Sequence, residues 1–251
     1  VNDVSARRGG MKYFQSEKRL QSYMLHHGMI TLPEYWRNVL VRFGGEVVAG
    51  NGLRKQLFRF MRSTPEKVQE SSRKSEVTSS KLENGTEQCP PFSVAICVYG
   101  KDNPEWFDTA LDSIIVHQTV KPNEVVLVVD GPVPDTIQRV IDKYSEICVG
   151  GTRFKVIQLP ENKGLGNALQ IAVKACSHEL IARMDSDDIA VEGRFEEQLQ
   201  YFNAHPDMDI LGGNIDEFID DIENVVGSRV VPTRNDEIRQ YIKKRCPFNH
   251  M

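Results

Sequence analysis

Hydrophobic positions change their spacing along the chain and divide it into two differently patterned parts. Between residues 11 and 27, large apolar side chains recur near helical spacing, and the pattern stops at Gly28, a residue typical of helix C-termini. Further along, four short and almost continuous apolar runs appear, at residues 92–99, 124–130, 153–159 and 179–184. The first part therefore predicts helices, and the second predicts buried β-strands.

Helical patterns lie between the four apolar runs, at residues 104–118, 133–146 and 165–176. Short strands that alternate with helices are typical of right-handed β-α-β crossovers, which build a mostly parallel sheet. The runs are apolar at nearly every position, as expected for strands covered on both faces. We therefore predict an α/β domain over residues 91–251, with a doubly wound, mostly parallel sheet and helices on both faces. Ligands of such sheets bind at the carboxyl ends of the strands.

The N-terminal part differs from this domain in pattern and in charge. Pro33 is well placed to open a second helix, and residues 53–62 carry an apolar face flanked by Lys and Arg. Residues 1–62 contain eleven Lys and Arg against four Asp and Glu, a balance of +7, whereas the whole chain has a net charge of −4. Residues 63–90 are polar and nearly free of large apolar side chains. We predict a basic helical segment over 1–62 and a flexible linker over 63–90.

Composition excludes several classes of protein. Of the 251 residues, 40% are hydrophobic and 26% are charged, which is ordinary for a globular protein. The apolar runs have strand length and fall well short of the ~18–20 residues that a membrane span needs, which argues against an integral membrane protein. The five cysteines are scattered without a C-x-x-C pair, which argues against a structural zinc site and a disulfide framework. A reducing, cytoplasmic location fits this pattern best.

An acidic run, Asp185-Ser186-Asp187-Asp188, directly follows the fourth apolar run. A buried strand that ends there brings several carboxylates to one edge of the sheet, and their mutual repulsion favours a bound cation. Mg²⁺ and Mn²⁺ prefer oxygen ligands and complete their coordination with phosphate and water. The D-x-D pattern therefore predicts a metal–diphosphate site, with Asp187 and Asp188 as metal ligands. In the alternative interpretation, one of these residues only caps the helix that follows.

Two other strand ends offer candidate ligand contacts. Asp130 ends the second run and could accept a hydrogen bond from a base or a sugar, although Asp130-Gly131 could equally form a simple turn. The segment Lys163-Gly164-Leu165-Gly166-Asn167 opens a helix, so its N–H groups and the helix dipole could attract an anion. It departs from the dinucleotide-binding pattern because Leu169 stands where that pattern has a small residue.

Four segments in the same order resemble the opening of a family 2 glycosyltransferase with the GT-A fold. They are FSVAICVYGKDNPEWFDTALDSIIVHQT, EVVLVVDGP, PENKGLGNALQIAVKACSHELIARMDSDDI and GRFEEQLQYF. The resemblance covers residues 92–251, and four motifs in family order are far more specific than any one of them.

The resemblance implies roles for residues at three strand ends. Tyr99 would border the nucleotide, and Asp130 would contact its base. The residues near the nucleotide and its phosphates would be Lys163, Gly164 and Asn167. Asp185 and Ser186 would contact the ribose or the sugar, while the metal would be held at Asp187.

The implied reaction is inverting, metal-dependent glycosyl transfer. The donor would be a nucleoside-diphosphate sugar, with a UDP-sugar expected, and the acceptor a glycan or a lipid-linked glycan in polysaccharide biosynthesis. A divalent Mn²⁺ or Mg²⁺ ion would neutralise charge on the leaving group, and a carboxylate base would deprotonate the acceptor hydroxyl. No residue of this chain can be nominated as that base from its sequence.

The N-terminal part resembles the other end of the same family. RRGGMKYFQSEKRLQSYMLHHGMITLPEYWRNVLVRF is similar to the C-terminal helical tail of such enzymes, so the order is inverted and the acceptor half with its base is expected to be missing. Three explanations are open: a fragment across two tandem transferase modules, a translation of incomplete or misassembled coding sequence, or a permuted protein. We expect this chain to bind donor and to transfer sugar poorly or not at all.

Other functions are consistent with parts of the pattern. The acidic run superficially fits the D-x-D-x-[TV] motif of haloacid dehalogenase phosphatases, but that motif follows the first strand of its fold and not the fourth. A module that binds nucleotide sugars without turnover is the non-enzymatic alternative. For the basic segment 1–62, peripheral docking on the inner, anionic face of a membrane and an ordinary packed tail are both open. No recognition motif accompanies the positive charge, so we expect no nucleic-acid partner.

Overall fold

The computed structural model describes residues 11–44, 47, 89–148, 151–219, 221–244 and 246–249. The chain divides into two compact units, one within residues 1–83 and 231–247, the other within residues 84–230 and 248–251. Residues 231–247, predicted for the α/β domain, thus group with the N-terminal helices. The predicted helix 53–62 and nearly all of the predicted linker 63–90 lie outside the described residues.

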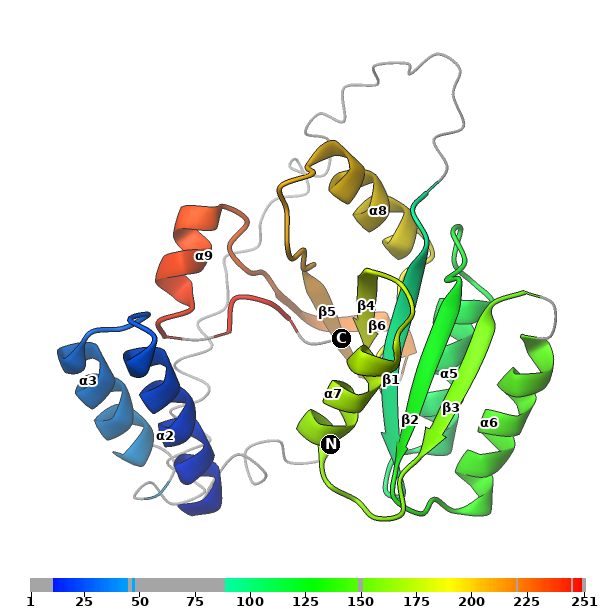
Figure 1. The fold of residues 1–251 in the computed structure, drawn as a ribbon, viewed down its shortest axis with the longest axis horizontal. Coiled ribbons are helices and arrows are strands. Elements are labelled where there is room, and N and C mark those ends of the chain that lie inside the picture. The colour runs from blue at the N-terminus through cyan, green and yellow to red at the C-terminus, as the bar shows by residue number, and fades with distance from the viewer. Residues whose placement is uncertain are drawn as a thin grey trace. The chain divides into compact units, whose positions relative to one another are not determined.

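A four-stranded parallel sheet forms the centre of the second unit (Figure 1). Its strands are β1 (Phe92–Tyr99), β2 (Glu124–Asp130), β3 (Arg153–Gln158) and β4 (Leu180–Met184). Their order in the sheet is β3-β2-β1-β4. The chain therefore moves outward from β1 through β2 to β3 and then returns across β1 to add β4 on its other side. The four predicted strands are confirmed, with ends that differ by one residue at most.

Helices cover both faces of this sheet. α5 (Pro104–Ile115) and α6 (Asp135–Ile147) pack on one face, and α7 (Leu165–Ala175) packs on the other (Figure 1). Nearly every residue of β1 and β2 is buried, which explains their continuous apolar sequence. The predicted α/β fold class, with a parallel sheet between helices on both faces, is confirmed.

Local sequence signals set the beginnings of two of these helices. Asn103 caps α5 by accepting hydrogen bonds from the N–H groups of Glu105 and Trp106, at 2.8 and 3.3 Å, and Pro104 occupies the first helical position. α7 begins after Gly164, whose φ of 89° lies in the region that favours glycine. Because α5 follows β1 and α7 follows β3, both helix N-termini lie toward the carboxyl edge of the sheet.

Beyond β4, the chain forms α8 (Arg194–Ala204) and an antiparallel hairpin of β5 (Ile215–Ile219) and β6 (Asp221–Arg229). α8 joins the same core as α5, where the rings of Phe195 and Phe92 meet edge-on at a centroid distance of 4.9 Å. The hairpin is largely exposed. It was absent from the sequence prediction, because its apolar residues are interspersed with acidic ones and form no continuous run.

The first unit contains α2 (Met11–His26), α3 (Leu32–Phe43) and the short α9 (Asn235–Tyr241). Its buried hydrophobic core consists of Phe14, Met24, Ile30, Tyr35 and Val39. Gly28 follows the end of α2 with a φ of 68°, as expected for a glycine at a helix C-terminus. The two predicted N-terminal helices that fall within the described residues are therefore confirmed.

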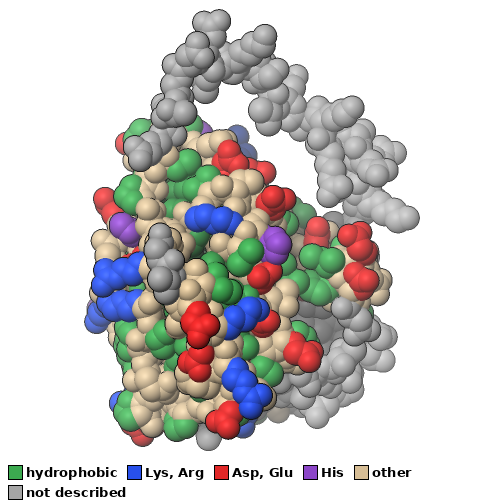
Figure 2. Space-filling model, turned by 90° about the vertical axis from the view of Figure 1, so that its right-hand side faces the viewer, with side chains coloured by type: hydrophobic (Ala, Val, Ile, Leu, Met, Phe, Trp, Pro, Cys, Tyr) green, Lys and Arg blue, Asp and Glu red, His purple; other side chains and the backbone are tan. Residues whose placement is uncertain are grey.

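The surface is mixed in character. On the face that Figure 2 shows, acidic, basic and hydrophobic side chains are interspersed. Large exposed apolar side chains are frequent on α3 and on the β5–β6 hairpin. Among the helices in the described parts of the chain, none combines the length and the apolar character that crossing a membrane requires.

Candidate functional site

The strand order places a natural ligand position at the carboxyl ends of β1 and β4. The crossovers run in one direction from β1 to β3 and reverse when the chain adds β4 beside β1. In open α/β sheets, such a reversal leaves room for a ligand outside the carboxyl ends of the two strands. Tyr99 ends β1 and Asp185 follows β4, so both residues flank this position.

The pleat of the strands turns three predicted site residues toward the same face of the sheet. Residues two positions before Tyr99 and Asp130 pack against α7, and side chains two apart share a face. The residue before Asp185 packs on the opposite face, so Asp185 also belongs to the α7 side. Burial, with further contributions from the charges of Asp185 and Asp130, raises the pKa of the Cys97 thiol to about 12. Both carboxylates therefore lie near Cys97, at one edge of the sheet.

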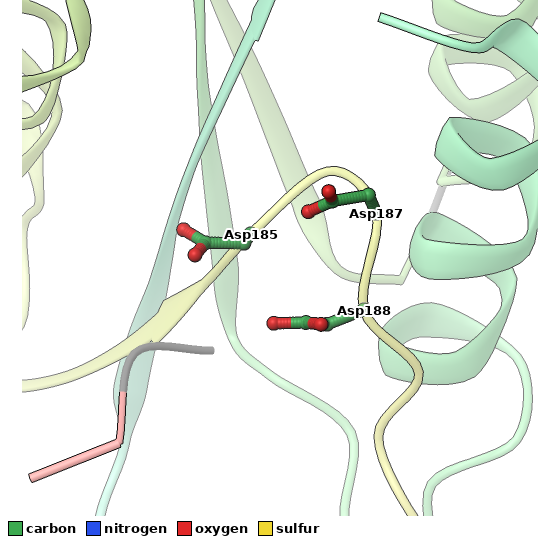
Figure 3. A group of neighbouring side chains, drawn as sticks. All are labelled: Asp185, Asp187 and Asp188. Atoms are coloured by element: carbon green, nitrogen blue, oxygen red, sulfur yellow. The ribbon is translucent and has the colours of Figure 1, made fainter. Parts of the chain in front are cut away.

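Asp185, Asp187 and Asp188 converge in the turn after β4 (Figure 3). One carboxylate oxygen from each residue lies within 4.8 Å of those of the other two. Asp187 is exposed, whereas Asp185 and Asp188 are half-buried. The acidic cluster that the sequence predicts at this strand end is therefore present.

Negative charge accumulates at this turn. Burial, and then the charges of Asp187 and Asp185, raise the pKa of Asp188 to about 6. Two arginines that were not identified from the sequence lie beside the cluster. Nη2 of Arg183 is 2.5 Å from Oδ1 of Asp185, and Arg194 donates a hydrogen bond of 2.9 Å to the carbonyl of Arg183. Both arginines lower the pKa of Asp188, against the larger effects of burial and of the two neighbouring carboxylates.

Asp102 is a fourth carboxylate at this site that was not identified from the sequence. Its Oδ2 accepts the N–H of Tyr99 at 3.1 Å and the hydroxyl of Ser186 at 2.9 Å. Burial raises the pKa of Asp102, these hydrogen bonds oppose the rise, and the charges of Asp187 and Asp185 add to it. Asp102 thus joins the loop after β1 to the acidic turn after β4. Its place in the short loop after the end of β1 is the signal that could have identified it.

Asp130 joins the end of β2 to the loop before α7. Its Oδ1 accepts the N–H of Lys163 and its Oδ2 accepts the N–H of Gly164, both at 2.8 Å. The residue is only 4% exposed. These two N–H groups, predicted from the sequence to attract an anionic ligand, therefore donate to Asp130 instead. Each carboxylate oxygen retains a second lone pair, so the contact of Asp130 with a base stays a prediction.

Close approach of the main chain beside Asp130 requires glycine. Gly131 has a φ of 88°, and a Cβ atom there would lie 2.6 Å from the backbone nitrogen of Asn162. A Cβ atom at Gly100 would lie 2.8 Å from the carbonyl oxygen of Pro132. The loops that follow β1, β2 and β3 therefore approach each other closely, which fixes the edge of the sheet where the candidate residues lie.

The side chains of Lys163 and Asn167, in the segment 163–167 that opens α7, differ in their surroundings. The ammonium group of Lys163 lies 3.3 Å from the carboxylate of Glu161, with about half of the side chain exposed. Asn167 lies in the first turn of α7, and its Nδ2 is shielded from solvent without a hydrogen-bond acceptor among the described residues. A buried donor without an acceptor is unfavourable. Asn167 therefore offers a buried donor that could bind a ligand oxygen.

The acidic run does not cap the helix that follows it. α8 begins after Gly193, and no side chain accepts a hydrogen bond at its N-cap. The intervening segment is held instead by buried polar contacts, among them the N–H of Ala190, which donates to Oγ of Ser113 at 3.1 Å. The capping interpretation is therefore wrong, and Asp187 and Asp188 are available for another role.

The cluster has the chemistry of a site for a hard divalent cation. Three carboxylates supply oxygen ligands, and Mg²⁺ or Mn²⁺ needs only a few of these when phosphate and water complete its coordination. A cation there would also favour the ionised form of Asp188, whose pKa is raised first by burial and then by the charges of Asp187 and Asp185. Asp185, Asp187 and Asp188 are the residues that could hold it.

Comparisons with known proteins agree with this arrangement. The family model described as Glycosyl transferase family 2 matches residues 93–251. An uncharacterized glycosyltransferase of Haemophilus influenzae is 39% identical over 160 residues, and the amylovoran biosynthesis glycosyltransferase AmsE of Erwinia amylovora is 36% identical over 160 residues; each match covers 64% of this chain. The UDP-Gal:alpha-D-GlcNAc-diphosphoundecaprenol beta-1,3-galactosyltransferase of Escherichia coli is 37% identical over 165 residues, 66% of this chain. The chain spans 58% of the length of each of these relatives.

Proposed function

Because this chain belongs to glycosyl transferase family 2, we propose that its α/β unit binds a nucleoside-diphosphate sugar together with Mg²⁺ or Mn²⁺. It does so for inverting transfer of the sugar to a glycan or lipid-linked acceptor in polysaccharide biosynthesis. The observation that carries this proposal is the convergence of three carboxylates, within 4.8 Å of one another, at the switch between β1 and β4.

Each carboxylate of the cluster has a proposed task. We assign Asp187 and Asp188 to the metal, and Asp185 with Ser186 to the ribose or the sugar. The bound cation would neutralise charge on the departing nucleoside diphosphate. Arg183, 2.5 Å from Asp185, holds that carboxylate in place. The exposed Asp187 is the ligand that solvent and the donor reach most readily.

The nucleotide is proposed to lie on the α7 side of the carboxyl edge. Tyr99 and Asp130 face that side, and the buried Nδ2 of Asn167 supplies a donor that lacks an acceptor among the described residues. Lys163 and Gly164 form the loop that Asp130 holds beside this space. We propose a UDP-sugar as the donor, since one similar enzyme is named for UDP-Gal and for a diphosphoundecaprenol-linked acceptor.

Donor binding is the part of the reaction that this chain supports. None of the described residues is assigned here as the base that would deprotonate the acceptor. We therefore expect the purified chain to bind the nucleotide and to transfer sugar to an acceptor poorly. Efficient transfer by the chain alone would show that a base is present in it and would contradict this part of the proposal.

Isothermal titration calorimetry of the full chain with UDP, in the presence of Mn²⁺ or of EDTA, tests the donor site. We expect binding that depends on the metal, and a loss of roughly 10- to 100-fold in affinity for Asp187→Asn, the range for removing an interaction with a charged group. Asp209→Asn, at an exposed position in the same unit, is the matched control and should bind as the natural chain does. GDP and ADP titrated in parallel report the choice of base.

Three results would argue against the proposal. UDP binding that is equally strong in EDTA would show that the metal is not needed. Equal losses of affinity in Asp187→Asn and Asp209→Asn would show that Asp187 is not part of the donor site. If none of UDP, GDP and ADP bound, the proposed donor site would be contradicted. Metal-dependent binding without turnover, even beside a complete transferase partner, would instead favour the non-enzymatic binding module. The acidic run follows the edge strand β4 and not the first strand, so it does not fit the phosphatase motif.

A further inference from the structure

One side of α3 presents an apolar stripe to solvent. Leu32, Trp36 and Leu40 recur every four residues along the helix, and their exposed fractions are 57, 53 and 64%. Phe43 continues the stripe at 39% exposure, although its ring also meets Phe14 edge-on. Residues three or four apart lie on the same side of a helix, so these side chains form one continuous surface.

The exposure of this stripe is not a consequence of poor packing of α3. The adjoining side of the helix is well buried through Tyr35 and Val39. Between them, Nδ2 of Asn38 donates to the side chain of Gln21 and to the carbonyl of Lys243, both at 2.9 Å. The orientation of α3 within its unit is therefore fixed by apolar and polar contacts, and the stripe is what this orientation leaves outside.

The charged side chain of α3 nearest the stripe is positive. At 100° per residue, the half of α3 from Leu32 round to Val41 also holds Pro33 and Arg37, and the exposed Arg37 is its only charged side chain. Glu34 lies outside this half and turns to the N–H of Thr31, at 2.8 Å, and to Lys243. Over the described residues of this unit, nine Lys and Arg stand against four Asp and Glu, a net charge of +5.

We propose that this face of α3, formed by Leu32, Trp36, Leu40 and Phe43 with Arg37 beside them, docks on an anionic lipid surface. Tryptophan favours the membrane–water interface, leucine and phenylalanine enter the acyl boundary, and arginine reaches the headgroups. A surplus of positive charge on the same unit attracts anionic lipid. A protein partner would need a complementary acidic groove, and nothing among the described residues points to such a partner. The docking does not depend on the donor site proposed above.

Flotation of the full chain with vesicles tests this docking. We expect the chain to bind vesicles that contain phosphatidylglycerol, to bind neutral phosphatidylcholine vesicles much less, and to dissociate as salt rises. Leu32→Ser with Leu40→Ser should weaken binding at least about tenfold, because two leucines lose their transfer into lipid. Ile222→Ser with Val226→Ser is the matched control, since these residues of β6 are 52 and 56% exposed, and it should bind as before.

A spectroscopic measurement locates the contact. The chain has two tryptophans, so Trp106→Phe leaves Trp36 as the only one. Brominated acyl chains should then quench the fluorescence of Trp36 in anionic vesicles. The proposal would be overturned if the chain failed to bind anionic vesicles, or if Trp36 stayed unquenched in the bound protein. It would also be overturned if the stripe variant and the control bound equally well. Self-association of the free chain that the stripe variant abolishes would overturn it too, because the face would then serve a second copy.

Discussion

At the scale of single residues, the aspartates of this site have different roles because their burial and their hydrogen-bond partners differ. Asp130 is buried, and its two oxygens hold the N–H groups of Lys163 and Gly164. Asp102 links two loops through the hydroxyl of Ser186. Asp187 is exposed and lies in the group of three that suits a cation. Burial and hydrogen-bond partners therefore separate the anchoring carboxylates from the proposed metal ligand.

The link between Asp102 and Ser186 should position the acidic turn. Ser186→Ala and Asp102→Ala should each weaken Mn²⁺-dependent UDP binding by at least roughly three- to tenfold, because each removes the hydrogen bond between the two residues and Asp102→Ala also removes the one from the N–H of Tyr99. Ser186→Thr, which keeps the hydroxyl, should retain affinity. The double variant should lose less than the product of the two single factors, because both changes break the contact between Asp102 and Ser186. Calorimetry on the four variants measures this coupling, and fully additive losses would show that the two residues act independently.

The raised pKa of Asp188 predicts how metal affinity depends on pH. At a pKa of about 6, the carboxyl group is largely protonated at pH 5 and ionised at pH 7, so Mn²⁺ affinity should rise between these values. Without metal the sign is opposite: this group's contribution to stability is present below pH 4 and is lost as the pH rises through about 6. Asp188→Asn should flatten the affinity profile in Mn²⁺ titrations followed by electron paramagnetic resonance. A profile that keeps its slope in this variant would assign the titration to another group.

At the scale of elements, the carboxyl edge depends on close approach between loops. Gly131→Ala should destabilise the α/β unit by at least about 1–2 kcal/mol for the positive φ alone, with the contact to Asn162 adding to this. Gly166→Ala is the matched control inside α7, where a Cβ atom meets nothing within 4 Å, and should be stabilising by about 0.5–1 kcal/mol. Urea unfolding followed by circular dichroism compares the two. Similar behaviour of both variants would show that the approach at Gly131 is not strained by a side chain.

Elements of the α/β unit follow from the sequence better than the contacts between their loops. The buried strands have continuous apolar runs, and Asn103-Pro104 and Gly164 mark helix starts, so these features are local. The contact of Asp130 with Lys163 and Gly164 joins residues more than thirty positions apart, and no local pattern encodes it. The exposed β5–β6 hairpin has no apolar run to reveal it. Buried elements can therefore be predicted from apolar runs in the sequence, whereas single polar contacts between loops cannot.

At the scale of the whole molecule, the change of pattern and charge along the sequence corresponds to two units of different construction. The basic N-terminal helices and residues 231–247 form one, and the parallel sheet with its acidic edge forms the other. The α/β fold and the strand-end position of the acidic run were predictable, because both follow from alternation of strands and helices. That residues 231–247 belong to the unit of the N-terminal helices was not predictable, since their short helix α9 has no strong apolar period of its own.

The central claim is that the acidic turn after β4 holds a divalent cation together with a nucleoside diphosphate. Anomalous diffraction from crystals of the chain grown with UDP and Mn²⁺ tests it most directly. The account predicts a manganese peak within coordination distance of the Asp187 and Asp188 carboxylates, with the diphosphate of UDP on the same ion. A peak bound elsewhere, or UDP bound away from the carboxyl ends of β1 and β4, would contradict it.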